Sequence, residues 1–247
     1  MTNIFFEIHS GLPREGPGDE ASTVRALALA RGLPSKPDIL DVGCGPGAQT
    51  LVLARATGGL VTAVDNHAPF LADLCRRAEL AGLSGEVRPV LGSMFELPFE
   101  EASFDLIWSE GAIFIMGFDQ GLVGWRRFLR PNGWLGVSEV AWLRKDPPQE
   151  LADFWNACYP AIRTIDENLA AIRYGGYEAA GHFVLPASSW WDSYYDPLMG
   201  RIGGLKEKYR GDAEAQGLLD EHLREMDIHK KYSDFYGYVF FVMKRMG

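Results

Sequence analysis

A glycine-rich turn, Asp41 to Ala48 (DVGCGPGA), separates an apolar run from a helical pattern. Glycines are needed where a ligand lies against the backbone, because a Cβ atom would hold the ligand away. The candidate binding residues in this turn are Gly43, Gly45 and Gly47. Asp65 ends the next apolar run, 20 residues after Gly45, at the position from which a carboxylate accepts a hydrogen bond from a ribose hydroxyl. The spacing predicts a site for a cofactor that contains adenosine.

Two residues in and beside the turn distinguish between classes of adenosine cofactor. Gly43-x-Gly45-x-x-Ala48 loosely fits a dinucleotide-binding pattern, in which the start of a helix binds a pyrophosphate. Pro46 has no N–H group, so the turn offers a pyrophosphate one donor fewer. Asp41 places a carboxylate beside the turn, which suits an ammonium or sulfonium group better than a phosphate. Together they predict adenosine joined to a cation, which is S-adenosylmethionine, with S-adenosylhomocysteine as its product.

S-adenosylmethionine carries a methyl group that its sulfonium activates, so the site must also bind an acceptor for that methyl group. Polar residues that act on the acceptor are expected after the fourth apolar run, residues 104–108, because ligands bind at the carboxyl ends of strands in open α/β sheets. Glu110 follows that run and is a candidate catalytic residue, facing either the acceptor or the amino acid end of the cofactor. The alternative is that Glu110 places a negative charge near the start of the next helix. Its neighbour Ser109 is a candidate cofactor-binding residue.

Four aromatic residues within six positions form a candidate wall for the acceptor pocket, since aromatic faces attract a sulfonium or a cationic substrate. They are Trp190, Trp191, Tyr194 and Tyr195. The alternative is that these residues pack between helices. His182, the histidine nearest to them along the chain, is a candidate general base, with a purely structural histidine as the alternative.

The stretch IHSGLPREGPGDE, residues 8–20, has closely spaced glycines and prolines that predict a shaped loop. Arg14 and Glu15 belong to this loop, and we expect them to close over the cofactor or the substrate as a lid. The alternative is a plain surface arm. A helix is expected next, capped by Ser22 or Thr23 and ending at about Arg31.

Short apolar runs alternate with helical patterns between residues 35 and 145, which is typical of a parallel sheet covered by helices on both faces. The expected strands are residues 39–42, 60–64, 87–91, 104–108 and 134–140. The expected helices between them are residues 48–56, 69–81 and 119–129. After residue 146 the pattern is mainly helical, over 148–173 and 190–231, with a short strand at 182–185 and a last strand at 236–243.

Several segments, in order, resemble the motifs of the class I S-adenosylmethionine-dependent methyltransferases. These segments are ILDVGCGPGAQT, VTAVDNH, VLGSMFELPFEEASFDLIWSEGA and LRPNGWLGVSEV. The resemblance implies a Rossmann-like, doubly wound sheet of seven strands, with the last strand, Tyr236 to Met243, antiparallel between the fifth and the sixth. It implies cofactor contacts from Asp65, Asn66, Ser93 and Met94. Many members have aspartate where this chain has Ser93, and Met94 is expected to pack against the adenine.

Composition argues against several other classes of protein. The chain has 247 residues, a formal net charge of −9 and a pI near 5.1, which disfavours nucleic acid or an anionic membrane as the main partner. No run of 18 residues lacks a charged side chain, and the N-terminus has no secretory-signal pattern. Three scattered cysteines indicate free thiols in a reducing cytoplasm, and no metal site is expected.

We therefore interpret the sequence as one domain with four parts: an N-terminal loop and helix (1–34), a cofactor-binding core (35–145), a helical and aromatic acceptor-side region (146–235) and the last strand (236–244). The predicted function is in-line transfer of a methyl group to a small-molecule acceptor. Two alternatives stay open. One is a non-catalytic sensor or scaffold that binds S-adenosylmethionine, and the other is a nicotinamide-dependent oxidoreductase.

Overall fold

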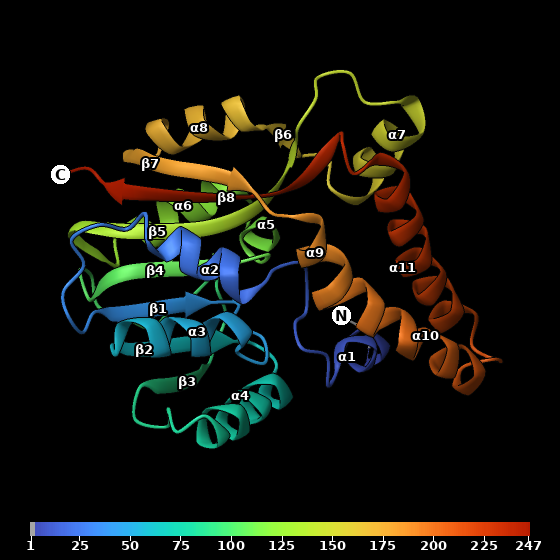
Figure 1. Cartoon of the computed structure of the whole chain (residues 1–247), viewed down its shortest axis with the longest axis horizontal. Coiled ribbons are helices and arrows are strands. Elements are labelled where there is room, and N and C mark those ends of the chain that lie inside the picture. Colours follow the sequence, from blue (N-terminus) through green and yellow to red (C-terminus); the bar gives the residue numbers. More distant parts are fainter. Residues whose placement is uncertain (1–2) are drawn as a thin grey trace.

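The computed structural model describes residues 3–247, which form a single sheet between two layers of helices (Figure 1). The eight-stranded sheet has the order β3-β2-β1-β4-β5-β8-β7, and β6 lies beside β5. The strands are β1 (Asp38–Val42), β2 (Leu60–Asp65), β3 (Val87–Leu91), β4 (Phe104–Glu110), β5 (Leu129–Trp142), β6 (Arg163–Thr164), β7 (Tyr177–Val184) and β8 (Tyr236–Arg245).

The helices are α1 (Asn3–His9), α2 (Glu20–Leu27), α3 (Ala48–Thr57), α4 (Ala68–Leu80), α5 (Ile113–Met116), α6 (Phe118–Arg126), α7 (Gln149–Cys158), α8 (Ile165–Tyr174), α9 (Ala187–Trp190), α10 (Asp196–Lys208) and α11 (Ala213–Tyr232). A π-helical segment, η1 (Trp191–Tyr195), joins α9 to α10. Within the described residues, no helix is both long and apolar enough to span a membrane.

The strands are parallel except for β8, which is antiparallel to both of its neighbours, as the sequence predicts. It pairs with β5 from Lys244 opposite Trp134 to Tyr236 opposite Trp142, and its other side pairs with β7. The N-terminal end of β8 therefore lies at the edge where the parallel strands end. Helices α1, α10 and α11 lie beyond this edge (Figure 1). In open α/β sheets that edge binds the ligand.

Three strands either were not predicted or differ from the predicted bounds by more than two residues at one end. Arg163 and Thr164 form an eighth strand, β6, which is too short to show any periodicity in the sequence. Strand β5 begins at Leu129 rather than at residue 134, because residues 131–133 form an irregularity within the strand, where Asn132 has a φ of +64°. Strand β7 begins at Tyr177 rather than at residue 182, since most of the residues between are exposed and form no apolar run.

Asn3–His9 form helix α1, which the sequence analysis did not predict. Ile4 and Ile8, one helical turn apart, are buried on the side that contacts α10.

The cap of α2 also differs from the prediction. Asp19, not Ser22, is the N-cap, because its carboxylate accepts a hydrogen bond from the Ser22 backbone N–H at 2.7 Å. The helix therefore begins at Glu20, before the predicted cap. It ends at Leu27 instead of at about Arg31.

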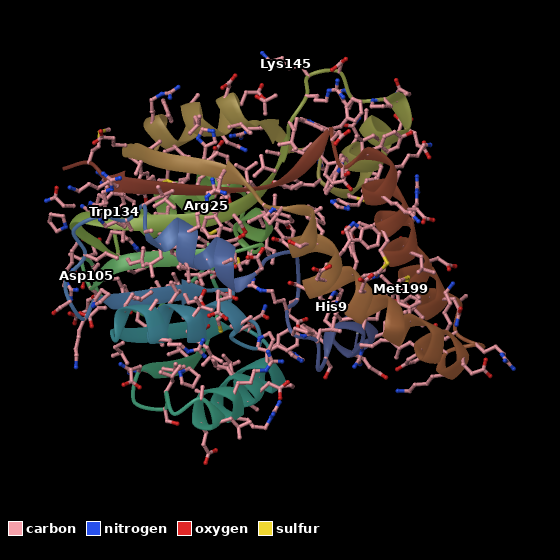
Figure 2. The ribbon with its side chains drawn as sticks, in the orientation of Figure 1. His9, Arg25, Asp105, Trp134, Lys145 and Met199 are labelled. Carbon is pink, nitrogen blue, oxygen red and sulfur yellow. The ribbon has the colours of Figure 1, made fainter. Side chains whose placement is uncertain are left out.

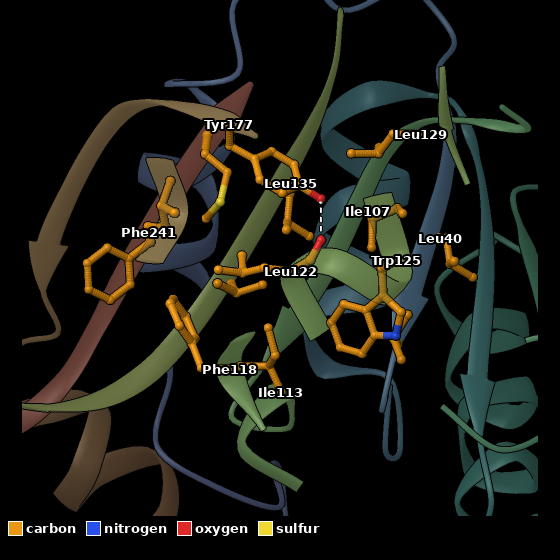
Figure 3. Close-up of a cluster of buried hydrophobic side chains, with 14 of the residues drawn as sticks. Leu40, Ile107, Ile113, Phe118, Leu122, Trp125, Leu129, Leu135, Tyr177 and Phe241 are labelled. Atoms are coloured by element: carbon orange, nitrogen blue, oxygen red, sulfur yellow. Dashed lines mark hydrogen bonds between the residues drawn. The ribbon is translucent and has the colours of Figure 1, made fainter. Parts of the chain in front are cut away.

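A large hydrophobic cluster joins the sheet to α5, α6 and α8 (Figure 3). Leu122 and Trp125 on α6 pack against strand residues such as Ile107 and Leu135. The Tyr177 hydroxyl donates a hydrogen bond to the Leu122 carbonyl at 2.9 Å, so the buried phenol has a partner. A second cluster lies under α2, α3 and α4, and a third joins α1, α7, η1, α10 and α11. This third cluster, which we call the cap cluster, holds the helices beyond the ligand edge together.

Two glycines give a matched test of packing inside the sheet and outside it. A Cβ on Gly136 in β5 would lie 2.4 Å from a ring carbon of the fully buried Trp108 on β4. We expect Gly136→Ala to lower the free energy of unfolding by about 1–3 kcal/mol, because neither the ring nor the strand has room to move. Urea denaturation would measure the change.

Gly217→Ala is the control, since Gly217 lies within α11 and a Cβ there would meet no atom within 4 Å. That substitution should raise the free energy of unfolding by about 0.4–1 kcal/mol. Equal stabilities for the two variants would contradict the packing described for Trp108.

Candidate functional site

A cavity opens at the carboxyl ends of the parallel strands. Its empty volume is about 1130 Å³, including space open to solvent. The lining residues come from five segments: 5–17, 43–49, 64–70, 92–95 and 110–115. Ligands of open α/β sheets bind in a crevice at this edge, so the cavity lies where a cofactor is expected.

The glycine turn between β1 and α3 forms one wall of this cavity. Gly43 lines it with a φ of +72°, and a Cβ there would lie 2.6 Å from the Cβ of Ala112. Gly45 also lines the cavity. Gly47 is not among the lining residues, and a Cβ on it would lie 2.1 Å from a methyl of Leu74. Gly43 and Gly45 therefore leave backbone open to a ligand, whereas Gly47 lets α4 pack against the turn.

Asp41 lies beneath the turn and is fully buried. Its carboxylate accepts hydrogen bonds from the Thr50 hydroxyl at 2.6 Å and from the Gln49 amide at 3.3 Å. Burial raises the pKa of Asp41 to about 7, and these hydrogen bonds oppose the rise. The sequence analysis expects this carboxylate to face a cofactor cation. In the structure it instead holds the start of α3 in place.

Asp65 ends β2 and lines the cavity, next to Asn66. One carboxylate oxygen accepts the Gly45 backbone N–H at 2.9 Å, and the other accepts the His67 backbone N–H at 2.9 Å. Burial raises the pKa of Asp65, while these backbone hydrogen bonds lower it. The side chain is thus fixed on the cavity wall by backbone hydrogen bonds to both of its oxygens.

The loop after β3 contributes Ser93, Met94 and Phe95 to the cavity wall. The Ser93 hydroxyl accepts a hydrogen bond from the Phe95 backbone N–H at 3.3 Å, which stabilises the loop. Phe95 is 59% exposed, so a large apolar side chain borders the cavity and also meets solvent. The sequence analysis selects Ser93 and Met94 here but not Phe95.

Glu110 lines the cavity, but its carboxylate is saturated with hydrogen bonds. One oxygen accepts two N–H groups of Arg14 at 2.8 and 2.9 Å. The other accepts the Thr23 hydroxyl at 2.7 Å and the Trp108 indole N–H at 2.8 Å. The side chains of the ion pair are only 9% and 4% exposed for Arg14 and Glu110. Glu110 therefore acts as a buried anchor for three elements, and this geometry gives no support to a role as a free base.

The N-terminal segment, residues 3–19, is bound to the elements on both sides of the cavity. On one side, Arg77 on α4 donates to the backbone carbonyls of Leu12 at 2.8 Å and Pro13 at 3.1 Å. On the other side, Lys208 on α10 pairs with Glu7 at 2.6 Å. The segment supplies seven lining residues, which are Phe5, Phe6, His9, Arg14, Glu15, Gly16 and Pro17.

Glu15 differs from its neighbour Arg14 because both of its carboxylate oxygens are buried without a hydrogen-bond partner. Burial raises the pKa of Glu15 to about 8. It is the one acidic side chain lining the cavity, within the described chain, whose two oxygens are both buried and unpaired. An unpaired buried carboxyl group is unfavourable, so this residue is a candidate ligand contact.

Several other predicted site residues lie away from the cavity. His182 on β7 is exposed, and its ring packs 6.0 Å from the ring of Phe241. Trp190, Tyr194 and Tyr195 are buried in the cap cluster, and Trp191 packs against it. Ser109 is fully buried and is not a lining residue. The aromatic residues thus pack between helices, the alternative that the sequence analysis left open.

The packing of the cap cluster explains this outcome. The Trp190 ring stacks on His229 of α11 with 4.2 Å between ring centroids, and the Tyr195 hydroxyl donates to Glu225 at 2.8 Å. Glu225 on α11 is therefore tied to η1. Side chains on α11, distant in sequence, occupy the positions where a ligand would have to contact the aromatic rings.

Helix α1 brings aromatic residues to the cavity that the sequence analysis did not select. Phe5, Phe6 and His9 line it, and Figure 2 shows His9 between the sheet edge and α10. His9 donates through Nδ1 to the Phe5 carbonyl at 2.9 Å, and its Nε2 lies 3.2 Å from the Tyr194 hydroxyl. Burial lowers the pKa of His9 to about 4, so the ring is neutral. The spacing of Ile4 and Ile8, four residues apart, is the sequence signal that indicates an amphipathic helix here.

Comparison with known families identifies the central part of this chain. Residues 39–133 match the family model described as "Methyltransferase domain". The matched stretch begins in β1 and ends early in β5, and it contains the glycine turn, Asp65 and Glu110.

Individual proteins extend this match. The chain is 29% identical over 190 residues to sterol 24-C-methyltransferase erg-4 of Neurospora crassa, covering 71% of this chain and 48% of that protein. The chain thus spans about half the length of the sterol methyltransferases that it resembles.

Two solved structures have the same fold over nearly the whole chain. A methyltransferase from Geobacter sulfurreducens, crystallised with S-adenosyl-L-homocysteine, gives a TM-score of 0.82 at 22% identity and covers 98% of both chains. The [4+2]-cyclase SpnF gives a TM-score of 0.76 at 20% identity, covering 98% of this chain and 91% of that one. At these identities the likeness establishes the fold, and the cyclase shows that one fold serves different chemistry.

Glu110→Gln tests the anchor. The substitution leaves the buried Arg14 guanidinium without its counter-charge, so we expect the free energy of unfolding to fall by about 3–5 kcal/mol. Chemical denaturation would measure the fall. Glu101→Gln, at an exposed position in the turn before β4, is the control and should change stability by less than about 0.5 kcal/mol. A Glu110→Gln variant as stable as that control would show that the buried ion pair is not an anchor.

Proposed function

We propose that this protein, a member of the class I S-adenosylmethionine-dependent methyltransferases, transfers the methyl group of that cofactor to a small acceptor molecule. The observation that carries the proposal is the convergence of Gly43, Gly45, Asp65 and the 92–95 loop on one cavity at the carboxyl edge of the sheet. The fold also matches that of a methyltransferase crystallised with S-adenosyl-L-homocysteine.

The cavity walls suit each part of this cofactor. Asp65 is a fixed carboxylate for the ribose hydroxyls, and the apolar Met94 and Phe95 suit the adenine ring. The backbone at Gly43, which borders the cavity without a side chain, suits the methionine end of the cofactor. The carboxyl of Glu15, which is buried and has no hydrogen-bond partner among the described residues, offers the ligand a further polar contact.

When bound, S-adenosylmethionine supplies a methyl group on a sulfonium centre, which an acceptor can take by in-line displacement. The protein's task is then mainly to orient the reactants and exclude water, and such positioning can contribute ~7–11 kcal/mol to lowering a barrier. Glu110 fixes Arg14 and the N-terminal segment over the cavity, and α1 adds Phe5 and Phe6 to its walls. We infer that this segment closes as a lid.

The acceptor that we propose is predominantly apolar. Three large apolar residues that line the cavity are also exposed, namely Phe95 at 59%, Phe114 at 38% and Ile115 at 44%. Exposed apolar side chains grouped around a cavity are typical of a binding site for an apolar ligand. The similarity to sterol 24-C-methyltransferase supports the same class of acceptor.

Calorimetric titration with S-adenosylmethionine, S-adenosylhomocysteine and NADH tests the cofactor. We expect saturable binding of the first two and none of NADH, and Asp65→Ala should weaken S-adenosylhomocysteine binding by about tenfold or more, since one charged hydrogen-bond acceptor is lost. Release of S-adenosylhomocysteine in the presence of apolar acceptors would then distinguish an enzyme from a non-catalytic sensor. Binding of NADH alone would overturn the proposal.

Arg77→Met tests the lid without disturbing the buried anchor. Arg77 holds the N-terminal segment through two carbonyl groups, so its loss should raise the KM for the cofactor about tenfold and leave kcat nearly unchanged. Steady-state kinetics would measure both constants. Arg76→Met, at the adjacent exposed position on α4, is the control and should leave KM unchanged. Identical KM values for the two variants would mean that closure of this segment does not affect cofactor binding.

A further inference from the structure

The carboxyl group of Glu15 is placed where a second contact to the cofactor could form. It lines the cavity, and a Cβ on Gly45 would lie 3.2 Å from the Glu15 Cγ, so the side chain lies directly against the glycine turn. The Gly45 backbone N–H in turn donates to Asp65 at 2.9 Å. Glu15 from the N-terminal segment and Asp65 from β2 therefore both lie next to Gly45.

Charged groups from three elements face Glu15, and none of them forms a hydrogen bond with it. These groups are Arg77 and Asp73 on α4, Asp65 on β2 and Arg201 on α10. Both guanidinium groups donate instead to backbone carbonyls of the N-terminal segment. Burial raises the pKa of Glu15 to about 8, the two aspartates add to this rise and the two arginines oppose it. Within the described chain, Glu15 thus lacks a donor.

We propose that Glu15 accepts a hydrogen bond from a ribose hydroxyl of the bound cofactor, so that Glu15 and Asp65 together bind the hydroxyls of one ribose. The inference rests on the proposed function, because it takes S-adenosylmethionine as the ligand. Two neighbouring carboxylates are two acceptors, and a vicinal diol supplies two donors. The N-terminal segment then recognises the cofactor directly rather than only covering it.

This arrangement makes the empty and the loaded protein respond oppositely to the loss of Glu15. Without ligand, a buried carboxyl with no partner is destabilising, so an apolar side chain of similar size should be better tolerated. With ligand, the same carboxyl forms a hydrogen bond, so removing it should weaken binding. A residue that merely packs the N-terminal segment would not raise stability and weaken binding at the same time.

The experiment compares Glu15→Leu, Glu15→Gln and the wild type, with Glu20→Gln on the exposed start of α2 as the control. We expect Glu15→Leu to raise the thermal midpoint of the ligand-free protein and to weaken S-adenosylhomocysteine binding about tenfold or more in calorimetry. Its effect on binding of the 2′,3′-dideoxy analogue should stay below about twofold, because that ligand lacks both donors. Glu15→Gln keeps an acceptor oxygen and should retain part of the affinity.

Proton release gives an independent measurement. A hydroxyl that donates to the carboxylate favours its ionised form, so binding should lower the pKa of Glu15 from about 8 and release a proton near pH 7. Affinity for S-adenosylhomocysteine should accordingly rise with pH up to about 8 and then level off. Calorimetry in two buffers of different ionisation enthalpy should detect the proton for the wild type and for Glu20→Gln but not for Glu15→Leu.

Three results would overturn the inference. Equal weakening of S-adenosylhomocysteine and its dideoxy analogue would mean that Glu15 only packs the N-terminal segment. Weakening confined to S-adenosylmethionine would mean that its partner is the sulfonium cation. In both cases the wild type still binds the cofactor and the proposed function stands. Failure of the wild type to bind S-adenosylhomocysteine would instead overturn the proposed function, and the inference with it.

Discussion

The buried carboxylate of Glu110 is the interaction on which the rest of the site depends. Its donors come from the N-terminal segment, from α2 and from β4. One side chain therefore fixes the N-terminal segment and α2 to the end of the central strand β4. Arg14 and Glu110 are both buried, and separating them would leave an unpaired charge, which is far more costly than breaking a surface ion pair. The N-terminal segment therefore has one defined place above the glycine turn.

The carboxylates around the cavity differ in how completely the protein satisfies them, and this difference separates structural roles from ligand-facing ones. Asp41 and Glu110 receive side-chain donors on both oxygens and act within the protein. Asp65 receives two backbone donors and still borders the cavity, whereas Glu15 receives none. Polar groups in a closed site must find partners, so the least satisfied ones are where a ligand completes the structure. Among the carboxylates that line the cavity, that of Glu15 is therefore where we expect a ligand to supply the missing hydrogen bonds.

Local signals in the sequence predicted much of the fold, and long-range contacts decided the rest. Strand β3 has the predicted bounds, and the Gly45 to Asp65 spacing placed two cavity residues correctly, because both depend on neighbouring residues along the chain. The role of Glu110 depends on Arg14, 96 positions away, which no local pattern can indicate. Similarly, the spacing of Trp190 and Tyr195 suits either a pocket wall or a helix interface. The packing of His229 and Glu225 from α11 decides for the interface.

Hydrogen exchange of the N-terminal segment, followed with and without S-adenosylhomocysteine, would test most directly whether cofactor binding and closure of this segment are one process. Residues 3–19 and the glycine turn contribute to the same cavity, so the ligand should slow exchange in both regions together. Exchange at Lys230 and Lys231, which are exposed at the C-terminal end of α11 and do not line the cavity, should be unchanged. Slower exchange in the glycine turn alone, with residues 3–19 unchanged, would contradict a lid that participates in cofactor binding.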